Sequence, residues 1–153
     1  VYKRQILYII RELLDFKPES KRTNLQGAIE YLTNVLKKRC TAFVLSDFID
    51  DSDFKNALTV ANRKHDVIAM QVYDRRMEEL PDVGLMRVRD AETGHEQWID
   101  TSSKALRNAH HAWWMERQEK LNDIFTRSNV DSVSVRTDQD YVKALMNLFA
   151  KRN

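Results

Sequence analysis

Aspartates gather in one short stretch of the sequence, "VLSDFIDDSDF" at residues 44–54. An apolar run comes first, and Asp47, Asp50, Asp51 and Asp53 follow it. Carboxylate oxygens suit a hard divalent cation such as Mg²⁺, which one or two carboxylates together with a hydroxyl can hold. The same side chains could instead cap a helix, because short acidic residues accept hydrogen bonds from the first amides of a helix.

Position separates these two interpretations. Asp47 follows an apolar strand, where few structural roles call for an acid. We therefore predict that it faces a metal or a partner. Asp50, Asp51 and Asp53 come just before a helical pattern that starts near Phe54, and we predict that they belong to the start of that helix.

A hydroxyl for the same site is available at Thr23. Thr23 and Gln26 have the spacing of a capping box, which predicts that Thr23 is the N-cap of a helix. At the mouth of that helix it is also the natural hydroxyl ligand for a cation beside Asp47.

Acids end the other predicted strands as well. Asp74 follows "QVY" and Asp138 follows "VRT". Ligands of open parallel sheets collect beyond the carboxyl ends of the strands, so the sequence predicts one acidic rim. Asp74 is a candidate partner-binding residue there.

Hydrophobic periodicity predicts the elements that carry these residues. Helical spacing predicts helices over 2–16, from Thr23 to about Arg39, around Phe54–Ala61, from Ser102 or Ser103 onward, and over 139–151. Short apolar runs predict buried strands at 41–48, 66–74 and 130–135, and alternation around a turn predicts a β-hairpin between about 84 and 100. The predicted fold class is α/β, with a mainly parallel sheet, flanking helices and an added hairpin.

The long helix after Ser103 is expected to turn Leu106, Ala109 and Trp113 inward, together with Leu121, Ile124 and Phe125. Trp114 is then a candidate for a partner-binding surface, although a core position with one exposed edge is the simpler expectation. His110 and His111 are adjacent and cannot share one face of a helix, unlike the i, i+4 pair of a helical zinc site.

Composition excludes several classes of function. The chain has 153 residues and a net charge of +2, with basic residues spread along it, so we expect one domain and no nucleic-acid binding. Three glycines leave no Gly-rich phosphate loop. The sequence has no apolar run near the ~20 residues of a membrane span, and its one cysteine, Cys40, permits no internal disulfide. We therefore expect no membrane contact and a cytoplasmic location.

Five segments together resemble the bacterial family DUF58, whose core is a von Willebrand factor A-like domain. They are "RTNLQGAIEYL", "FVLSDF", "HDVIAMQVYDRRMEELPDVGLMRVRDAETG", "IDTS" and "TDQDYVKALMNLF". The resemblance covers the chain from Ile6 onward. It implies a doubly wound, Rossmann-like sheet, with residues 1–153 forming one truncated domain.

In domains of this type three loops build a metal-ion-dependent adhesion site. The resemblance assigns the threonine of the second loop to Thr23 and the aspartate of the third loop to Asp47. The Asp-x-Ser-x-Ser motif of the first loop does not occur in this sequence. The resemblance therefore implies the C-terminal part of the domain, with an incomplete Mg²⁺ site.

The resemblance implies a non-enzymatic protein-interaction module that binds a partner's carboxylate through Mg²⁺ in the intact protein. A MoxR-type AAA+ ATPase is the partner that it suggests. The alternative is a Mg²⁺-dependent phosphoryl-transfer or hydrolytic α/β enzyme that uses Asp47 and Asp74. Spacing shows no base or nucleophile for that chemistry, which favours the binding module.

The same resemblance places the strand at 41–47 beside the first strand of the family, which is absent from this sequence. Its backbone would then form an exposed apolar edge. We expect the fragment to self-associate through edge pairing or exposed helix faces, and a strictly monomeric species in light scattering would contradict this.

Overall fold

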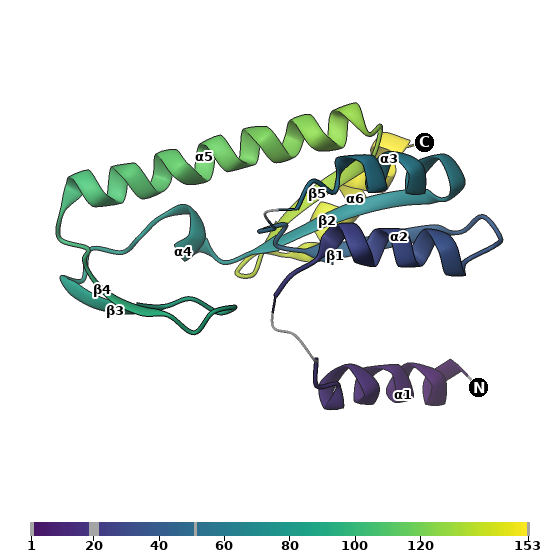
Figure 1. Cartoon of the computed structure of the whole chain (residues 1–153), viewed down its shortest axis with the longest axis horizontal. Coiled ribbons are helices and arrows are strands. Elements are labelled where there is room, and N and C mark those ends of the chain that lie inside the picture. Colours follow the sequence, from purple (N-terminus) through teal and green to yellow (C-terminus); the bar gives the residue numbers. More distant parts are fainter. Residues whose placement is uncertain (1, 19–21, 51, 153) are drawn as a thin grey trace.

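The computed structural model describes residues 2–18, 22–50 and 52–152 (Figure 1). The helices are α1 (Tyr2–Asp15), α2 (Leu25–Val35), α3 (Lys55–Lys64), α4 (Arg75–Glu78), α5 (Lys104–Arg127) and α6 (Tyr141–Arg152). The strands are β1 (Thr41–Ser46), β2 (Asp66–Tyr73), β3 (Leu85–Arg89), β4 (Glu96–Asp100) and β5 (Asp131–Arg136). These elements confirm the predicted α/β class.

The main sheet has three parallel strands in the order β1-β2-β5. Ala42 is paired with Val67, and Ile68 with Asp131. Because neighbouring strands are parallel, their carboxyl ends meet at one edge of the sheet. That edge carries the loops after Ser46, Tyr73 and Arg136.

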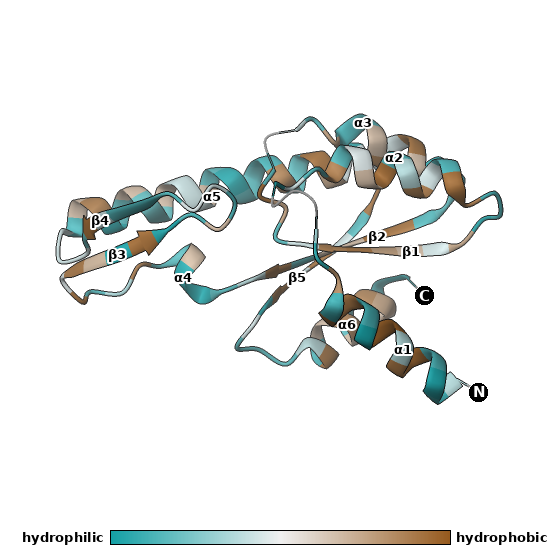
Figure 2. Cartoon of the chain, turned by 60° about the horizontal axis from the view of Figure 1, so that its bottom comes forward, coloured by the Kyte–Doolittle hydropathy of each residue, from teal (hydrophilic) through white to brown (hydrophobic). Residues whose placement is uncertain are grey.

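One face of the sheet holds the main core. Helices α2, α3 and the C-terminal part of α5 cover this face (Figures 1 and 2). Val67 and Ala69 of β2 pack in one cluster with Leu58 of α3 and Phe125 of α5. Alternate residues of a strand point to opposite faces, which explains why Val67 and Ala69 share this cluster.

The other face is only partly covered. Helix α6 lies on it, and Phe149 makes an edge-to-face ring contact with Phe43 of β1 at 6.4 Å between centroids. Phe43 and Leu45 nevertheless remain 43% and 62% exposed. The apolar surface of this face therefore continues past α6 to the β1 edge.

The predicted hairpin is present as the antiparallel pair β3 and β4. It lies near the end of α5 that extends beyond the sheet (Figure 1). Arg107 of α5 pairs with Asp82 at 3.0 Å, just before β3. At the tip, Gly94 has φ +72, a conformation that glycine adopts without strain.

Helix α1 forms as predicted, but it buries none of its side chains. Figure 1 shows it apart from the sheet, on the side of β1. Its apolar stripe remains exposed: Ile6, Leu7, Ile10, Leu13 and Leu14. Among the described helices, none is both long and apolar enough to span a lipid bilayer.

Two predicted boundaries of α2 are wrong. Asn24, not Thr23, is the N-cap, and its side chain accepts a hydrogen bond from the amide of Gly27 at 2.8 Å. The helix ends at Val35, four residues before the predicted end near Arg39. Threonine and asparagine are both good cap residues. Here the Asn24 side chain takes the cap hydrogen bond, whereas the Thr23 hydroxyl donates to Glu92.

The orientation predicted for α5 is wrong over its first half. Leu106 and Ala109 are exposed because this half of the helix extends past the sheet. Trp113 is 44% exposed, whereas its neighbour Trp114 is 3% exposed. Leu121 and Phe125 do point inward, as expected.

Candidate functional site

Asp47 lies directly after β1, at the carboxyl edge of the sheet, and its side chain is exposed. One carboxylate oxygen, Oδ1, accepts a hydrogen bond from the amide of Ile49 at 3.0 Å. The backbone carbonyl of Asp47 accepts from the side chain of Gln71 at 3.4 Å. Within the described part of the chain, Oδ2 of Asp47 has no hydrogen bond, so it is open to a ligand.

The loop after Asp47 is fixed by Phe48. This residue has φ +56, a left-handed conformation that is strained for a bulky side chain. Its ring is buried and contacts Phe125 at 5.1 Å between centroids. Arg117 of α5 donates to its carbonyl at 3.2 Å. Packing of the ring therefore holds a backbone conformation that directs Asp47 outward.

Asp50 joins this loop to the start of α2. Its carboxylate accepts hydrogen bonds from the Leu25 amide at 2.6 Å and from the Ser52 amide at 2.8 Å. Burial raises the pKa of Asp50, but the hydrogen bonds from Leu25 and Ser52 outweigh this effect and lower it. Asp50 thus stabilises the start of α2, as an anion at a helix N-terminus does.

The predicted role of the neighbouring acids is confirmed only in part. Asp50 was expected at the start of α3 and instead contacts α2. Asp53 does lie at the start of α3, where it accepts from the amide of Lys55 at 3.3 Å. Asp51 lies outside the described residues.

Thr23 lies two residues before Leu25, next to the Asp50 contact. Its amide and its hydroxyl both donate to Glu92 Oε1, the amide at 2.8 Å. Glu92 belongs to the turn between β3 and β4, so the hairpin tip reaches the segment before α2 (Figure 1). We call residues 23–25 together with residues 47–50 the α2–β1 rim.

Unlike Asp47, the acids that follow β2 and β5 contact other side chains. Asp74 caps α4, accepting from the Arg76 amide at 2.8 Å, and lies 3.5 Å from the Thr137 hydroxyl. Asp138 pairs with Arg136 at 2.6 Å, and this hydrogen bond lowers the pKa of Asp138. These two carboxylates therefore have partners, and the predicted acidic rim is partly neutralised by Arg136.

Trp114 does not form part of a surface. It is buried and contacts the ring of Tyr73 at 5.1 Å between centroids. Trp113 is the exposed indole, and the guanidinium of Arg117 lies 5.9 Å from its ring centroid. Of the two tryptophans of α5, Trp113 is therefore the one that a partner could contact.

The donor chemistry of the α2–β1 rim suits Mg²⁺ only in part. Thr23 supplies a hydroxyl and Asp47 an open carboxylate oxygen, both of which are oxygen ligands of the right kind. Across residues 2–18, 22–50 and 52–152, however, no three His, Cys, Asp or Glu side chains are grouped to hold a metal. The described residues alone do not complete a metal site.

The family of this chain follows from comparison with known proteins. A family model described as "Protein of unknown function DUF58" matches residues 2–120. The chain belongs to the DUF58 family. This result confirms the resemblance seen in the sequence at the level of the family.

Two mycobacterial relatives of this DUF58 chain carry names that assign no activity. An uncharacterised protein of Mycobacterium tuberculosis is 30% identical over 137 residues, which cover 88% of this chain and 42% of that protein. An uncharacterised protein of Mycobacterium avium is 27% identical over 135 residues, covering 88% of this chain and 79% of that protein. The chain thus spans less than half of the M. tuberculosis relative. No solved structure matches the DUF58 chain described here.

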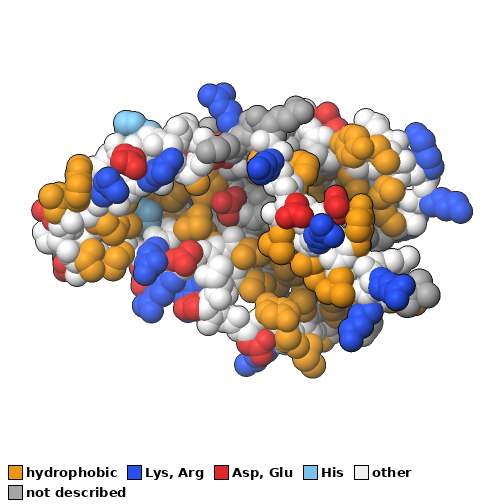
Figure 3. Space-filling model, turned by 90° about the horizontal axis from the view of Figure 1, so that it is seen from below, with side chains coloured by type: hydrophobic (Ala, Val, Ile, Leu, Met, Phe, Trp, Pro, Cys, Tyr) orange, Lys and Arg blue, Asp and Glu red, His pale blue; other side chains and the backbone are white. Residues whose placement is uncertain are grey.

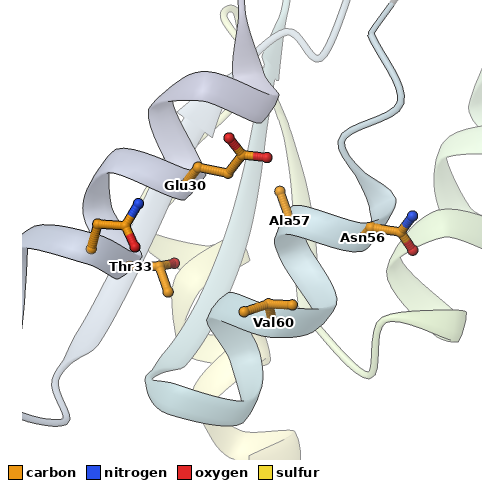
Figure 4. A pocket seen from close by; sticks show the side chains of 6 residues that line it. Glu30, Thr33, Asn56, Ala57 and Val60 are labelled. Atoms are coloured by element: carbon orange, nitrogen blue, oxygen red, sulfur yellow. The ribbon is translucent and has the colours of Figure 1, made fainter.

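The DUF58 chain also has a pocket that the sequence did not indicate. It has a volume of about 250 Å³ and lies between α2 and α3 (Figure 4). Its lining is Glu30, Thr33, Asn34, Asn56, Ala57 and Val60. These residues are spread over two helices with ordinary amphipathic patterns, so only the packing of the helices reveals the pocket.

The contacts of Asp50 and Glu92 were also missed. Asp50 is 25 residues from Leu25, and Glu92 is 69 residues from Thr23. No local pattern links positions so far apart. The turn signal around Gly94 could have indicated a hairpin tip, but not the segment that the tip contacts.

Proposed function

We propose that the chain is part of a non-enzymatic protein-interaction module of the von Willebrand factor A type, with the α2–β1 rim as its binding face. Asp47 and Thr23 would contribute to a Mg²⁺ site in the whole protein, together with oxygen ligands from outside the described residues. The bound ion would supply a Lewis-acidic position for a carboxylate of the partner. A MoxR-type AAA+ ATPase is the partner that we would test first.

One observation carries this proposal: the hydrogen bond from the Leu25 amide to Asp50 at 2.6 Å. It joins the loop of Asp47 to the segment of Thr23, although the two come from different parts of the chain. The residues assigned to the second and third loops of an adhesion site therefore belong to one fixed rim.

The state of the carboxylates supports the same face. Asp47 is exposed and keeps one oxygen open, whereas Asp138 is paired with Arg136 and Asp74 caps α4. A metal ion could bind the open carboxylate oxygen of Asp47 without breaking an existing ion pair.

The contacts of the acids favour binding over catalysis. In the described ranges, the Asp47 carboxylate accepts a hydrogen bond from a backbone amide, and the Asp74 carboxylate accepts from a backbone amide and a threonine hydroxyl. Neither carboxylate has a hydrogen bond with a histidine or cysteine there. A hydrolytic or phosphoryl-transfer site would need a base or nucleophile within hydrogen-bond reach of the reacting atoms. A binding module needs neither.

Calorimetric titration of the whole protein, as its gene encodes it, with Mg²⁺ and Mn²⁺ tests the proposal. We expect Asp47→Asn to weaken metal binding at least tenfold, because a ligand oxygen loses its charge. Asp53→Asn is the matched control, since Asp53 is an exposed acid of the same loop. Capture of a purified MoxR-type ATPase should require Mg²⁺ and be lost with EDTA and in Asp47→Asn. Metal and partner binding that Asp47→Asn leaves unchanged would contradict the proposal.

A further inference from the structure

A row of polar side chains crosses the main sheet directly below the loop of Asp47. Gln71 of β2 is the register partner of Ser46 in β1 and of Ser134 in β5. Ala69, two residues before Gln71, belongs to the core cluster, and alternate residues of a strand share a face. Gln71 therefore lies on the face that α2, α3 and α5 cover, at the carboxyl edge of the sheet.

Gln71 is the buried member of this row, with only 2% of its surface exposed. Burying an amide costs free energy unless hydrogen bonds replace its contacts with water. Apolar side chains are not scarce in this chain, since many of them remain at the surface on the side of α1 (Figure 3). A buried glutamine is therefore the more informative observation, and its hydrogen bonds identify its role.

Both ends of the Gln71 amide have a partner. The hydroxyl of Ser134 donates to Oε1 at 2.9 Å, and Nε2 donates to the backbone carbonyl of Asp47 at 3.4 Å. A carbonyl can only accept, so the nitrogen of the amide must face Asp47 and its oxygen must face Ser134. Ser134 thereby holds the amide in the orientation that binds the loop.

The next residue of the loop is held from outside as well. The Phe48 amide donates to the hydroxyl of Ser46 at 2.9 Å, and the Phe48 carbonyl accepts from Arg117 of α5 at 3.2 Å. Two successive carbonyls, those of Asp47 and Phe48, are thus bonded to side chains of β2 and α5. These contacts use backbone groups of the loop, and none of them uses Oδ2 of Asp47.

We propose that Gln71 is a positioning residue of the α2–β1 rim: its buried amide, oriented by Ser134, holds the Asp47 carbonyl and with it the direction of the Asp47 carboxylate. A carboxylate that is already held in one direction loses less freedom when it binds a ligand. The effect of Gln71 on binding rests on the function proposed above, whereas its effect on the loop does not.

Amide hydrogen exchange of the whole protein, measured without metal, tests the effect on the loop. Gln71→Met keeps a side chain of similar length but removes both hydrogen bonds, and Ser134→Ala removes only the bond that orients the amide. The Ile49 amide donates to Asp47 Oδ1. We expect it to exchange about tenfold faster in Gln71→Met, and at an intermediate rate in Ser134→Ala. The carbonyl carbon signal of Asp47 should shift in the same order.

Val67→Ala is the matched control. Val67 is buried on the same face of β2 but at the opposite end of the strand, so its truncation should lower stability and leave exchange at Ile49 unchanged. Circular dichroism verifies folding, and Ser134→Ala, which changes an exposed residue, decides the outcome if Gln71→Met does not fold. Wild-type exchange at Ile49 in either variant, or equal acceleration by Val67→Ala, would overturn the proposal.

Calorimetric titration of the whole protein with Mg²⁺ separates positioning from binding. Gln71→Met should weaken Mg²⁺ binding about tenfold or more, because residues that orient a metal ligand affect metal affinity to this extent. If the wild type binds no Mg²⁺, the proposed function fails, while exchange at Ile49 still decides whether Gln71 holds the loop. Equal Mg²⁺ affinity of the wild type and Gln71→Met would overturn the positioning role.

Discussion

At the scale of single residues, Asp50 organises the candidate site more than Asp47 does. Asp47 is exposed and holds only its own loop, whereas Asp50 joins that loop to the first amide of α2. Hydrogen bonds to a charged acceptor are among the stronger ones in proteins. The residue that positions the binding face is therefore distinct from the residue that we assign to binding.

We predict that Asp50→Asn lowers the free energy of unfolding by about 1–2 kcal/mol at pH 7, because its hydrogen bonds lose their charge. Asp53→Asn, in the same loop, should change it by less than about 0.5 kcal/mol. Urea denaturation followed by circular dichroism measures both values. Equal effects of the two substitutions would show that the contact with Leu25 is unimportant.

The difference between wild type and Asp50→Asn should depend on pH. Folding lowers the pKa of Asp50 below its ordinary value of 3.8, so the ionised form is favoured in the folded chain. The stabilisation is complete above the pKa of the unfolded chain and is lost as pH falls through the folded pKa. Denaturation at a series of pH values should show a constant difference above pH ~5 and a decline below the ordinary pKa. A difference that grows toward acid would contradict this assignment.

At the scale of elements, the N-cap of α2 is not the residue that the sequence pattern predicts. Thr23 and Gln26 have capping-box spacing, yet Asn24 is the cap. We predict that Asn24→Ala lowers the free energy of unfolding by about 1 kcal/mol, because the Gly27 amide loses its acceptor. Thr23→Val, which removes only the exposed hydroxyl bond to Glu92, should cost less. Thermal and urea denaturation of both variants measure the two losses of stability. A larger loss for Thr23→Val than for Asn24→Ala would indicate that Thr23 is the cap.

The elements that sequence predicted well are those with strong local patterns. Residues 41–46 and 66–73 are mainly apolar runs next to helices, and they form the parallel strands expected of them. Helix α5 was predicted, but with Trp113 facing inward in place of Trp114, because adjacent indoles at 113 and 114 fit the helical period almost equally well. Which of them is buried depends on Tyr73, 41 residues before Trp114, and no local pattern contains that contact.

At the scale of the whole molecule, the chain has one well-packed face and one open face. Helices α2, α3 and α5 complete the core on the first face, whereas α6 covers the second only in part and α1 buries none of its own described side chains.

The candidate site could be predicted only to the level of its separate residues. Strand-end position and helix-start chemistry, together with the family resemblance, indicate Asp47 and Thr23 as candidate ligands. Their common rim depends on the contact between Asp50 and Leu25, which no local pattern contains. The pairing of Asp138 with Arg136 is local, two residues apart, and could have been expected from sequence.

The most direct test of the central claim is to locate a paramagnetic ion on the whole protein by NMR. Substoichiometric Mn²⁺ broadens the amide signals of residues close to its binding site. The account predicts that the signals of Thr23, Asp47 and their neighbours broaden first, and that Asp47→Asn removes this effect while Asp53→Asn does not. Broadening centred on Asp74 or Asp138, or no selective broadening at all, would contradict the assignment of the α2–β1 rim as the binding face.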